Sequence, residues 1–209
     1  MINIKNNLLI FFFSFTLFAN QSAFEWNSMT SLINPTSLIK DSNNNLVAAT
    51  SGGLLLLEQG KINILKNNLI NLNLSIIGID ERGLIWLGGS YPNGNIQVLD
   101  NNYNLIYDSN YLEIESVIDF YFSNNRVFVV YNNQNDIGIL EFNYDNDIPY
   151  YIDYYNSFPD QINQISDVDL FDNYIYLTTD KGVFSSNINS NLKISSSWIE
   201  PSYGIDDDI

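Results

Sequence analysis

The sequence contains neither cysteine nor histidine among its 209 residues. Without cysteine, the chain can form no disulfide and carries no thiol chemistry. Without histidine, it cannot build the Ser-His-Asp or Cys-His nucleophilic systems, and zinc loses both of its usual ligands. A Walker-type Gly-Lys-Ser/Thr loop and a strand–Gly-x-Gly-x-x-Gly–helix unit, which bind phosphates, are absent too. We therefore expect no catalytic residue, no cofactor and no metal site.

Positive charge is also scarce, because 8 Lys and Arg residues face 24 Asp and Glu residues, for a net charge of −16. No long Lys/Arg cluster occurs anywhere in the chain. A chain this acidic is a poor ligand for nucleic acid or anionic lipid. The acids are scattered, which favours solubility outside the cell over an acidic binding site. The expected partner is a protein or a surface glycan, and no nucleic acid.

The N-terminus has the three-part layout of a secretory signal peptide. Lys5 precedes an eleven-residue apolar run, Leu8–Phe18, and small and polar residues follow as far as Ala23. A retained membrane anchor is the alternative, but a spanning helix needs about twenty apolar residues. We expect residues 1–23 to be a signal peptide cleaved between Ala23 and Phe24. The mature chain would then reach the periplasm, cell surface or exterior with no stable membrane span, carrying seven cations, 24 acids and a net charge of −17.

A segment of similar sequence recurs four times along the chain. The copies are Asp41–Gly53, Asp80–Gly89, Asn124–Tyr131 and Asp172–Gly182. The residues that align within them are Val47, Trp86, Phe128 and Tyr176, at steps of 39, 42 and 48 residues. A period of about forty residues is typical of four-stranded propeller blades. One such unit cannot bury its own faces, so stability would come from stacking the units.

The pattern inside each repeat predicts four antiparallel strands. In the second repeat, an apolar strand at Ser75–Ile79 is followed by a turn at Glu81–Gly83 and a continuous apolar run at Leu84–Leu87. Continuous apolarity indicates a strand covered on both faces, as between neighbouring blades. A third strand is expected at Ile96–Leu99, and the first repeat shows a more polar fourth strand at Lys61–Leu65. We predict an all-β fold, a β-propeller of four-stranded antiparallel blades with about four blades present.

Several repeat positions are expected to be structural. Asp and Gly close tight turns, small residues suit strands that crowd the central axis, and large apolar residues pack between blades. These positions are Asp41, Thr50, Gly53, Asp80, Gly83, Trp86, Gly88, Phe128, Tyr176, Thr179 and Gly182.

Three of these motifs resemble a known family. The unit Asp-x-x-Gly-x-Ile-Trp-x-Gly over residues 80–88 resembles the repeat of the two-component-regulator propeller family. Thr50-Ser-Gly-Gly-Leu54 and Thr179-Asp-Lys-Gly-Val183 resemble the T-x-x-G-[LV] turn of the same repeat. The segment Phe24–Ser31, just after the signal peptide, resembles the start of the N-terminal propeller of PorZ-like proteins.

The resemblance to PorZ-like proteins implies a place in the type IX secretion machinery of Bacteroidota-like bacteria. It also implies a role at the outer surface, in attachment or maturation of secreted cargo. The chain departs from the family pattern at Val47, which replaces the tryptophan, and at Asn44, which replaces the glycine. The third repeat lacks the Asp-Gly turn, and the C-terminal sorting domain typical of relatives does not occur within these 209 residues.

Four blades are the lower limit for a closed ring, since propellers typically carry four to eight. Trp198 lies where a fifth repeat would begin, much as Trp26 precedes the first. We therefore expect the propeller domain, residues 24–209, to be incomplete at its C-terminus and part of a larger ring. An incomplete ring would expose apolar residues around Leu54–Leu57 and at Val183 and Phe184. A closed four-blade ring is the alternative.

Three acidic segments could carry chemistry, and each has a structural alternative. Tyr144–Asp147, continuing to Tyr155, could line a sugar site with paired carboxylates, or form an outer strand and loop of the third blade. The spacing Asp41-x-Asn43-x-Asn45 begins like a calcium loop, but its twelfth residue is Gly52 rather than glutamate, which favours a hairpin turn. Asp206–Asp208 reads as a chain terminus.

Two function hypotheses follow from this sequence. The first is an exported, non-enzymatic module that binds a protein or glycan in a type IX secretion or surface-assembly and sensing system. The second is a secreted propeller enzyme acting on glycans. The lack of an acid–base set at matching positions of several repeats favours the first.

Overall fold

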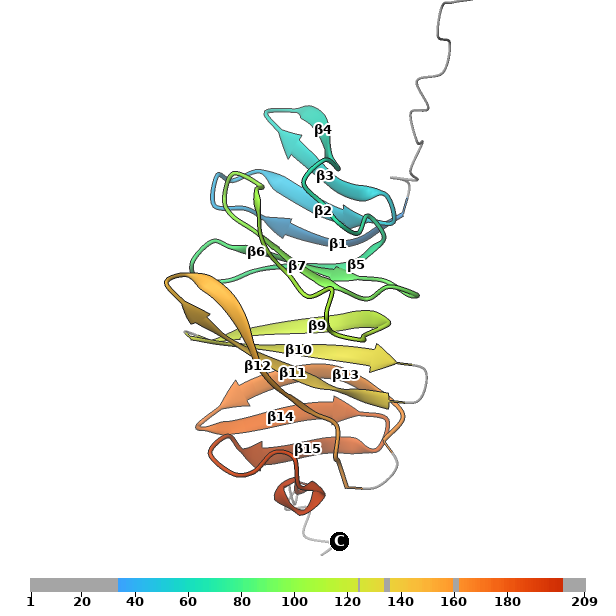
Figure 1. The fold of residues 1–209 in the computed structure, drawn as a ribbon, viewed down its shortest axis with the longest axis vertical. Helices are drawn as coiled ribbons and strands as arrows, with labels where there is room; N and C mark the ends of the chain where they lie inside the picture. The colour runs from blue at the N-terminus through green and yellow to red at the C-terminus, as the bar shows by residue number, and fades with distance from the viewer. Residues whose placement is uncertain (1–33, 124, 134–135, 160–161, 201–209) are drawn as a thin grey trace, which may run out of the picture.

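The structure, a computed structural model, describes residues 34–123, 125–133, 136–159 and 162–200 (Figure 1). The expected signal peptide, its cleavage point at Ala23 and Phe24, and Asp206–Asp208 lie outside the described residues.

The described chain forms antiparallel sheets whose strands follow one another in sequence order. The first sheet, blade one, contains β1 (Pro35–Lys40), β2 (Leu46–Thr50), β3 (Gly53–Glu58) and β4 (Lys61–Leu65). Blade two contains β5 (Leu74–Ile79), β6 (Ile85–Gly89), β7 (Ile96–Leu99) and β8 (Leu105–Asp108). Blade three contains β9 (Ser116–Ser123), β10 (Arg126–Asn133), β11 (Asp136–Asp145) and β12 (Ile148–Tyr155). Blade four contains β13 (Ile165–Phe171), β14 (Tyr174–Thr179) and β15 (Gly182–Asn187).

Blade four differs from the others in its outer edge. It has three full strands, and a single antiparallel bridge between Ser185 and Ile199 stands where a fourth strand would run. A short 3₁₀ helix, η1 (Ser195–Ser197), precedes that bridge. The prediction of an all-β fold built from antiparallel blades is therefore confirmed. Within the residues that the structure describes, no helix has the length and apolar character needed to cross a membrane.

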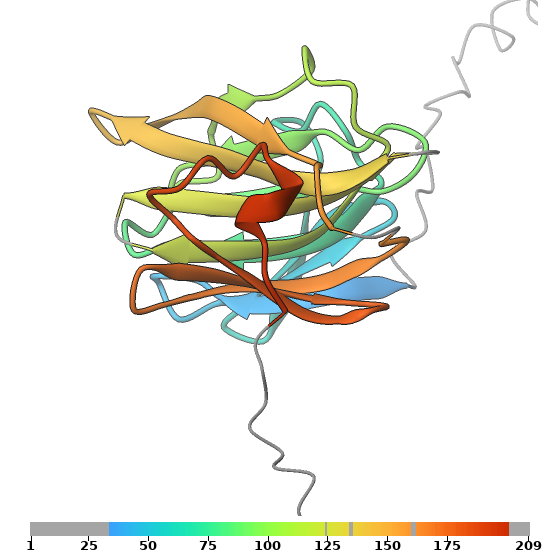
Figure 2. The ribbon, with the colours of Figure 1, turned by 90° about the horizontal axis from the view of Figure 1, so that it is seen from below.

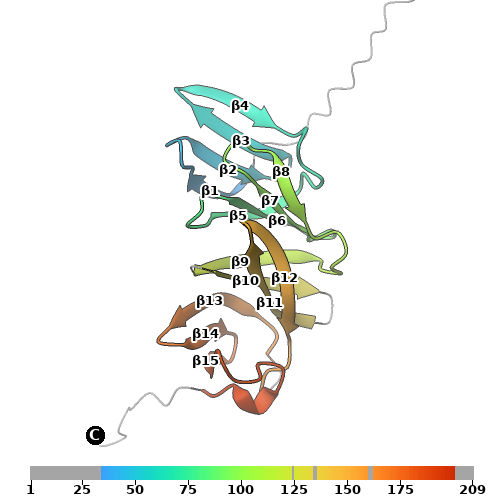
Figure 3. The same ribbon diagram turned by 60° about the vertical axis from the view of Figure 1, so that its left-hand side comes forward.

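The four blades stack face to face in chain order, with blades one and four at opposite ends (Figures 1 and 3). The first strands of successive blades lie beside each other, β1 by β5, β5 by β9 and β9 by β13. Figure 2 views this stack along its length. The sheets do not close on themselves, so the described residues form a partial propeller.

An apolar layer fills each junction between neighbouring blades. The aligned repeat positions Val47, Trp86 and Phe128 each point from the second strand of one blade toward the next blade, and each is 0% exposed. In blades two and three, the residues on either side of Trp86 and Phe128 in the strand face the preceding blade instead. This explains why the second strands read as continuous apolar runs.

The side chains expected at the open faces divide between the two faces of their sheets. Leu54 and Leu56 are buried against blade two, whereas Leu57 points away from it and is 36% exposed. In blade four, Phe184 is buried against blade three and is 3% exposed. The expectation of exposure is therefore wrong for Leu54 and Phe184, because alternation along a strand sends neighbouring side chains to opposite faces.

Trp198 does not begin a fifth repeat, which the sequence had predicted, but belongs to blade four. Its side chain is 3% exposed and belongs to the apolar layer between blades three and four. The indole Nε1 donates a hydrogen bond to the Leu192 carbonyl at 3.0 Å, and the ring packs edge-on against Phe158 with centroids 5.2 Å apart. The segment after β15 folds back to cover this layer, so Trp198 serves blade four.

The turns between first and second strands of blades one and two share one construction. In the β1–β2 turn, Asp41 Oδ1 accepts hydrogen bonds from the backbone N–H groups of Asn43 and Asn45. In the β5–β6 turn, Asp80 Oδ1 does the same for residues 82 and 84. The fourth residue of each turn is left-handed, Asn44 with φ 66° and Gly83 with φ 80°. Asparagine tolerates this conformation, which accounts for the departure from the family pattern at Asn44.

Candidate binding site

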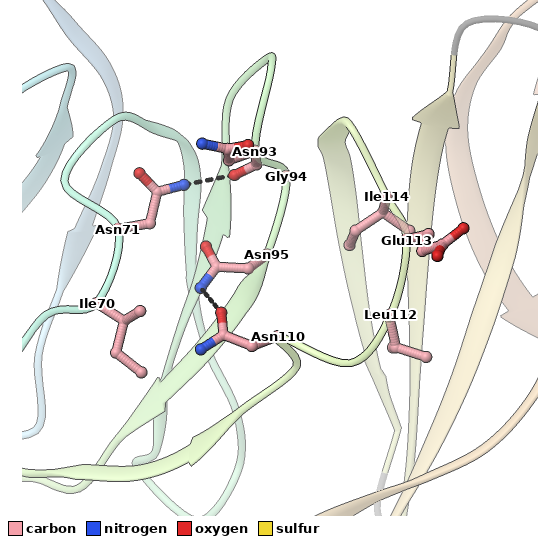
Figure 4. A pocket seen from close by; sticks show the side chains of 9 residues that line it. All are labelled: Ile70, Asn71, Asn93, Gly94, Asn95, Asn110, Leu112, Glu113 and Ile114. Carbon is pink, nitrogen blue, oxygen red and sulfur yellow. Dashed lines mark hydrogen bonds between the residues drawn. The ribbon is translucent and has the colours of Figure 1, made fainter.

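A polar cavity of about 390 Å³ lies where three loops of blades one to three meet (Figure 4). The loops connect β4 to β5, β6 to β7, and β8 to β9, and we call this end of the propeller the cavity end. Four asparagine side chains line the cavity, namely Asn71, Asn93, Asn95 and Asn110. The volume falls within the range of small-ligand sites.

Gln97 on β7 holds the β4–β5 loop, which forms one wall of the cavity. Its side chain is 0% exposed on β7. Its Oε1 accepts hydrogen bonds from the N–H groups of Ile70 at 2.6 Å and Asn71 at 3.2 Å, and its Nε2 donates to the Asn71 carbonyl at 2.9 Å. Asn71 Nδ2 in turn donates to the Asn93 carbonyl at 2.5 Å. The β4–β5 loop is thus tied both to the strand below and to the neighbouring loop.

Gly94 lets the second loop touch the third. Its N–H donates to the Ile114 carbonyl at 3.1 Å. A Cβ at this position would lie 2.3 Å from backbone atoms of Glu115 and Ser116, a separation that no side chain tolerates. The third loop is held from the other side by Asn133, whose Nδ2 donates to the Glu113 carbonyl at 2.8 Å. The cavity walls are therefore cross-linked by hydrogen bonds before any ligand arrives.

Asn95, one of the residues that line this cavity, carries a buried and unsatisfied acceptor. Its side chain is 8% exposed, and its Nδ2 donates a long hydrogen bond of 3.4 Å to Asn110 Oδ1 (Figure 4). Its Oδ1 is buried with no hydrogen-bond partner within the described part of the chain. An unpaired buried acceptor costs about 1–3 kcal/mol. A donor supplied by a ligand would remove that cost.

The remaining lining residues limit the kind of ligand. Ile70, Leu112 and Ile114 contribute apolar surface, and the carboxylate of Glu113 points away from the asparagine side chains (Figure 4). None of the residues that line the cavity is a cation. The site therefore suits a neutral or cationic group that offers hydroxyl or amide donors, and it disfavours phosphate or sulfate.

The acidic segment of blade three forms a strand and hairpin at the end opposite the cavity. Asn146 and Asp147 form the β11–β12 turn with φ of 50° and 62°. Asp147 is exposed and accepts an ion-paired hydrogen bond from Arg82 Nε at 3.1 Å. The interpretation as an outer strand and loop is confirmed. Asp145 ends β11 and Asp147 lies in the turn, both on the surface, where we expect them to serve the hairpin.

The Asp41 loop is a hairpin turn, which is the interpretation that the sequence favoured over a calcium loop. Besides the two backbone donors at Oδ1, Oδ2 accepts hydrogen bonds from Asn45 Nδ2 at 3.1 Å and from the Tyr103 hydroxyl at 2.5 Å. Burial opposes ionisation, but the hydrogen bonds from Tyr103, Asn45 and Asn43 outweigh it and lower the pKa of Asp41. Both carboxylate oxygens are thus occupied by donors from the protein.

The Thr-x-x-Gly motifs are two copies of one turn. Thr50 Oγ1 donates to the Gly53 carbonyl at 2.7 Å, and Thr179 Oγ1 donates to the Gly182 carbonyl at 2.9 Å. Gly53 and Gly182 have φ of 111° and 120°, in a region that side chains rarely adopt. Gly88 serves packing instead, because a Cβ there would lie 2.5 Å from Val117 Cβ of the next blade.

The structure also brings together a carboxyl pair that sequence reasoning missed. Asp119 on β9 and Asp167 on β13 occupy the same register position in successive blades. Each lies two residues before the partner of the aligned second-strand residue, Phe128 or Tyr176. Partial burial and the hydrogen bond with Asp167 raise the pKa of Asp119 to about 7. Aspartates at the same repeat position of consecutive blades are the sequence signal that could have revealed the pair.

This pair predicts that stability falls as the pH rises. The folded chain holds a proton on Asp119 up to about pH 7, whereas an unfolded aspartate releases it near 3.8. The folded state therefore binds more protons between those values, and the pair's favourable contribution is lost as the pH rises through about 7. Asp119→Asn should flatten this dependence and raise the unfolding free energy at about pH 8 by on the order of 1 kcal/mol.

Urea unfolding at about pH 5 and about pH 8 measures the effect. Asp145→Asn, at the exposed end of β11, is the control and should behave like the unsubstituted protein. If Asp119→Asn loses as much stability over that range as the unsubstituted protein, the carboxyl pair is not the cause.

Comparison with known proteins places the fold. No protein-family model matches the sequence, and no curated protein does. The extracellular domain of BT3049, described as a hybrid two component system of B. thetaiotaomicron, superposes with a TM-score of 0.58 at 18% identity, over 78% of this chain and 22% of that one. PorZ, described as a bacterial surface component of the type-IX secretion system of Porphyromonas gingivalis, superposes with a TM-score of 0.57 at 17% identity, over 80% and 26%.

The computationally designed Ika4 protein is also similar, with a TM-score of 0.55 at 13% identity, over 75% of this chain and 92% of that one. The chain spans about a quarter of the length of the BT3049 domain and of PorZ. The resemblance to two-component-regulator and PorZ propellers is thereby confirmed for the fold. The segment Phe24–Ser31, on which the PorZ resemblance was based, lies outside the described residues.

Proposed function

We propose that the chain is an exported, non-enzymatic propeller module that binds a protein or glycan ligand at the cavity end, within a type IX secretion or surface-assembly and sensing system. The observation that carries the proposal is the unpaired, buried Oδ1 of Asn95, a residue that lines a cavity whose walls are already fixed. Pre-organised polar groups of this kind give specificity without the ordering cost of a flexible loop.

Export is supported by the N-terminal signal pattern and by the proteins whose structures are similar to this one. The similar structures include an extracellular domain and a protein described as a bacterial surface component. Those descriptions belong to those proteins, and fold likeness alone is a weak warrant for function. The strongly negative charge adds support, since it suits solubility outside the cell.

The ligand chemistry follows from the cavity lining. Amide groups both donate and accept hydrogen bonds, which matches sugar hydroxyls and peptide main-chain groups equally well. Since none of the lining residues is a cation, the cavity favours a ligand without negative charge. A neutral glycan unit or an extended peptide segment of secreted cargo fits this description.

Asn95→Ala is expected to weaken ligand binding about tenfold, because one hydrogen bond is worth about 1–1.5 kcal/mol. Tagged full-length protein would be used to capture ligands from the native cell envelope, and the captured species would then be titrated by calorimetry. Asn101→Ala, at the exposed β7–β8 turn of the opposite end, is the matched control and should bind like the unsubstituted protein.

Two outcomes would contradict the proposal. Equal binding by the Asn95→Ala variant, with an unchanged melting temperature, would place the ligand elsewhere. Hydrolysis of a surface glycan by the purified chain, abolished by substituting Asp145 and Asp147, would show that the enzyme hypothesis is right.

A further inference from the structure

Blade one carries an apolar face that no other described part of the chain covers. The face spans all four strands, and its cross-strand rows follow from the register. One row is Leu38, Ala48, Leu55 and Ile64, and the next is Lys40, Leu46, Leu57 and Ile62. The most exposed aliphatic side chains are Leu38 at 61% and Ile62 at 64%, with Ile64 at 47%. We call this surface the blade-one face.

Comparison with the same repeat position in the other blades shows that this face resembles a surface that packs against another blade. Leu46 is 41% exposed, whereas the residues at its repeat position in blades two to four are Ile85 at 1%, Val127 at 0% and Ile175 at 0%. In those blades the position packs against the preceding blade. The blade-one face therefore has the composition of a blade junction and lacks a preceding blade. Exposed patches of this kind mark interaction sites.

The opposite end of the stack carries the complementary kind of face. On blade four, Tyr176 occupies the repeat position at which Val47, Trp86 and Phe128 pack toward the next blade, and it is only partly buried. Phe171 at 67% and Tyr174 at 38% exposure lie in the neighbouring row. We call this surface the blade-four face. It is the side of a blade that would receive a following blade.

We propose that two copies of this chain close into one ring of eight blades, with the blade-one face of each copy packed on the blade-four face of the other. At each junction within the chain, the side of one blade that faces the next blade packs on the side of the next blade that faces back. Only pairing the blade-four face of one copy with the blade-one face of the other repeats that arrangement. Eight blades lie within the usual range of four to eight. Closure leaves neither face exposed, as a two-fold ring of heterologous contacts requires.

Charge complementarity favours this pairing over contact between two blade-one faces. Residues 34–66 contain three lysines and two acids, for a net charge of +1, in a chain whose net charge is −16. Residues 163–200 contain five acids and two lysines, for a net charge of −3. Lys40 lies in a row of the blade-one face on β1, and Asp169 lies beside Tyr176 on β13. Stacking first strand on first strand brings these opposite charges together.

The mass of the secreted chain in solution tests the proposal. Light scattering coupled to size exclusion should give twice the monomer mass at micromolar concentration. Leu38→Glu on the blade-one face and Phe171→Glu on the blade-four face should each raise the dissociation constant at least a hundredfold. Both residues are largely exposed in the single copy, so the monomers should melt cooperatively, and Ile148→Glu, on exposed β12, is the matched control that should keep the dimer.

Mixing the two variants distinguishes the head-to-tail ring from other dimers. In a ring made of one copy of each variant, the intact blade-four face of Leu38→Glu meets the intact blade-one face of Phe171→Glu. A heterodimer should therefore form, although each variant alone is monomeric. A monomer for the unsubstituted chain would overturn the proposal. So would a dimer that survives Phe171→Glu, which would indicate pairing of two blade-one faces, or growth into long filaments, which would show that the ring does not close.

Discussion

Replacing Trp86 with alanine is expected to lower the free energy of unfolding by about 3–5 kcal/mol. The side chain is 0% exposed at the junction between blades two and three. Its ring contacts Phe120, Phe122 and Phe142 of the next blade, with centroids 6.0, 6.0 and 5.5 Å away. Removing the indole would leave a cavity among side chains from two sheets, which cannot collapse without moving a whole blade.

Urea unfolding followed by circular dichroism measures this loss, since the sheet signal does not depend on the deleted indole. Trp86→Phe retains most of the packing and should cost about half as much. Tyr150→Ala, an aromatic deletion at a site that is 41% exposed, is the control and should cost less than about 1 kcal/mol. A loss below about 1 kcal/mol for Trp86→Ala would contradict the packing described here.

The repeat period and the turn chemistry were sufficient to predict the strands. Ile96–Leu99 and Lys61–Leu65 begin and end where the sequence predicted, because Asn, Asp and Gly close the turns on either side. The burial of Trp86 could also be predicted, since a continuous apolar second strand requires cover on both faces. Local chemistry and global architecture agree at these positions.

Features that depend on the curvature of the stack could not be predicted. Trp198 matched the start of a repeat, but its burial depends on how the segment after β15 folds back across blades three and four. The cavity is formed by loops of different lengths that have no periodic pattern, and its key acceptor, Asn95, is one asparagine among many. The Asp119 and Asp167 pair is different, because aligning the third and fourth repeats and taking β9 and β13 as neighbours would have revealed it.

Two hydrogen bonds between blades repeat along the stack and were also hidden in the sequence. The Tyr103 hydroxyl of blade two donates to Asp41 of blade one, and the Tyr144 hydroxyl of blade three donates to Asp80 of blade two at 2.6 Å. In both cases the acceptor is Oδ2 of the aspartate that also closes the turn between first and second strands. Burial and the hydrogen bond to Asp80 raise the pKa of Tyr144, so its hydroxyl keeps its proton at physiological pH. Each turn aspartate therefore joins its own hairpin to the next blade.

Replacing Asp80 with alanine is accordingly expected to destabilise the fold by about 3 kcal/mol, the second large effect. Asp80 is 7% exposed and accepts four hydrogen bonds. Two come from turn N–H groups, one from Trp86 Nε1 at 3.0 Å and one from Tyr144. Alanine would leave the indole N–H and the tyrosine hydroxyl buried without an acceptor.

Asp100 supplies the matched control for this substitution. Its carboxylate closes the β7–β8 turn with the same pattern, accepting from the N–H groups of Asn102 and Asn104 and from Asn104 Nδ2. That turn is exposed, and none of these three donors comes from another blade. Asp100→Ala should therefore cost only about 1 kcal/mol, the usual value of such a turn or cap.

A double-mutant cycle isolates the contact between blades. Tyr144→Phe alone should cost about 1–1.5 kcal/mol, and much less when Asp80 is already alanine, because the hydroxyl then has no acceptor to lose. Urea unfolding of the four proteins gives the coupling energy, expected at about 1 kcal/mol. Equal losses for Asp80→Ala and Asp100→Ala, with no coupling to Tyr144, would mean that Asp80 only closes its turn. A large difference with coupling would show that the aspartate of each turn holds neighbouring blades in register.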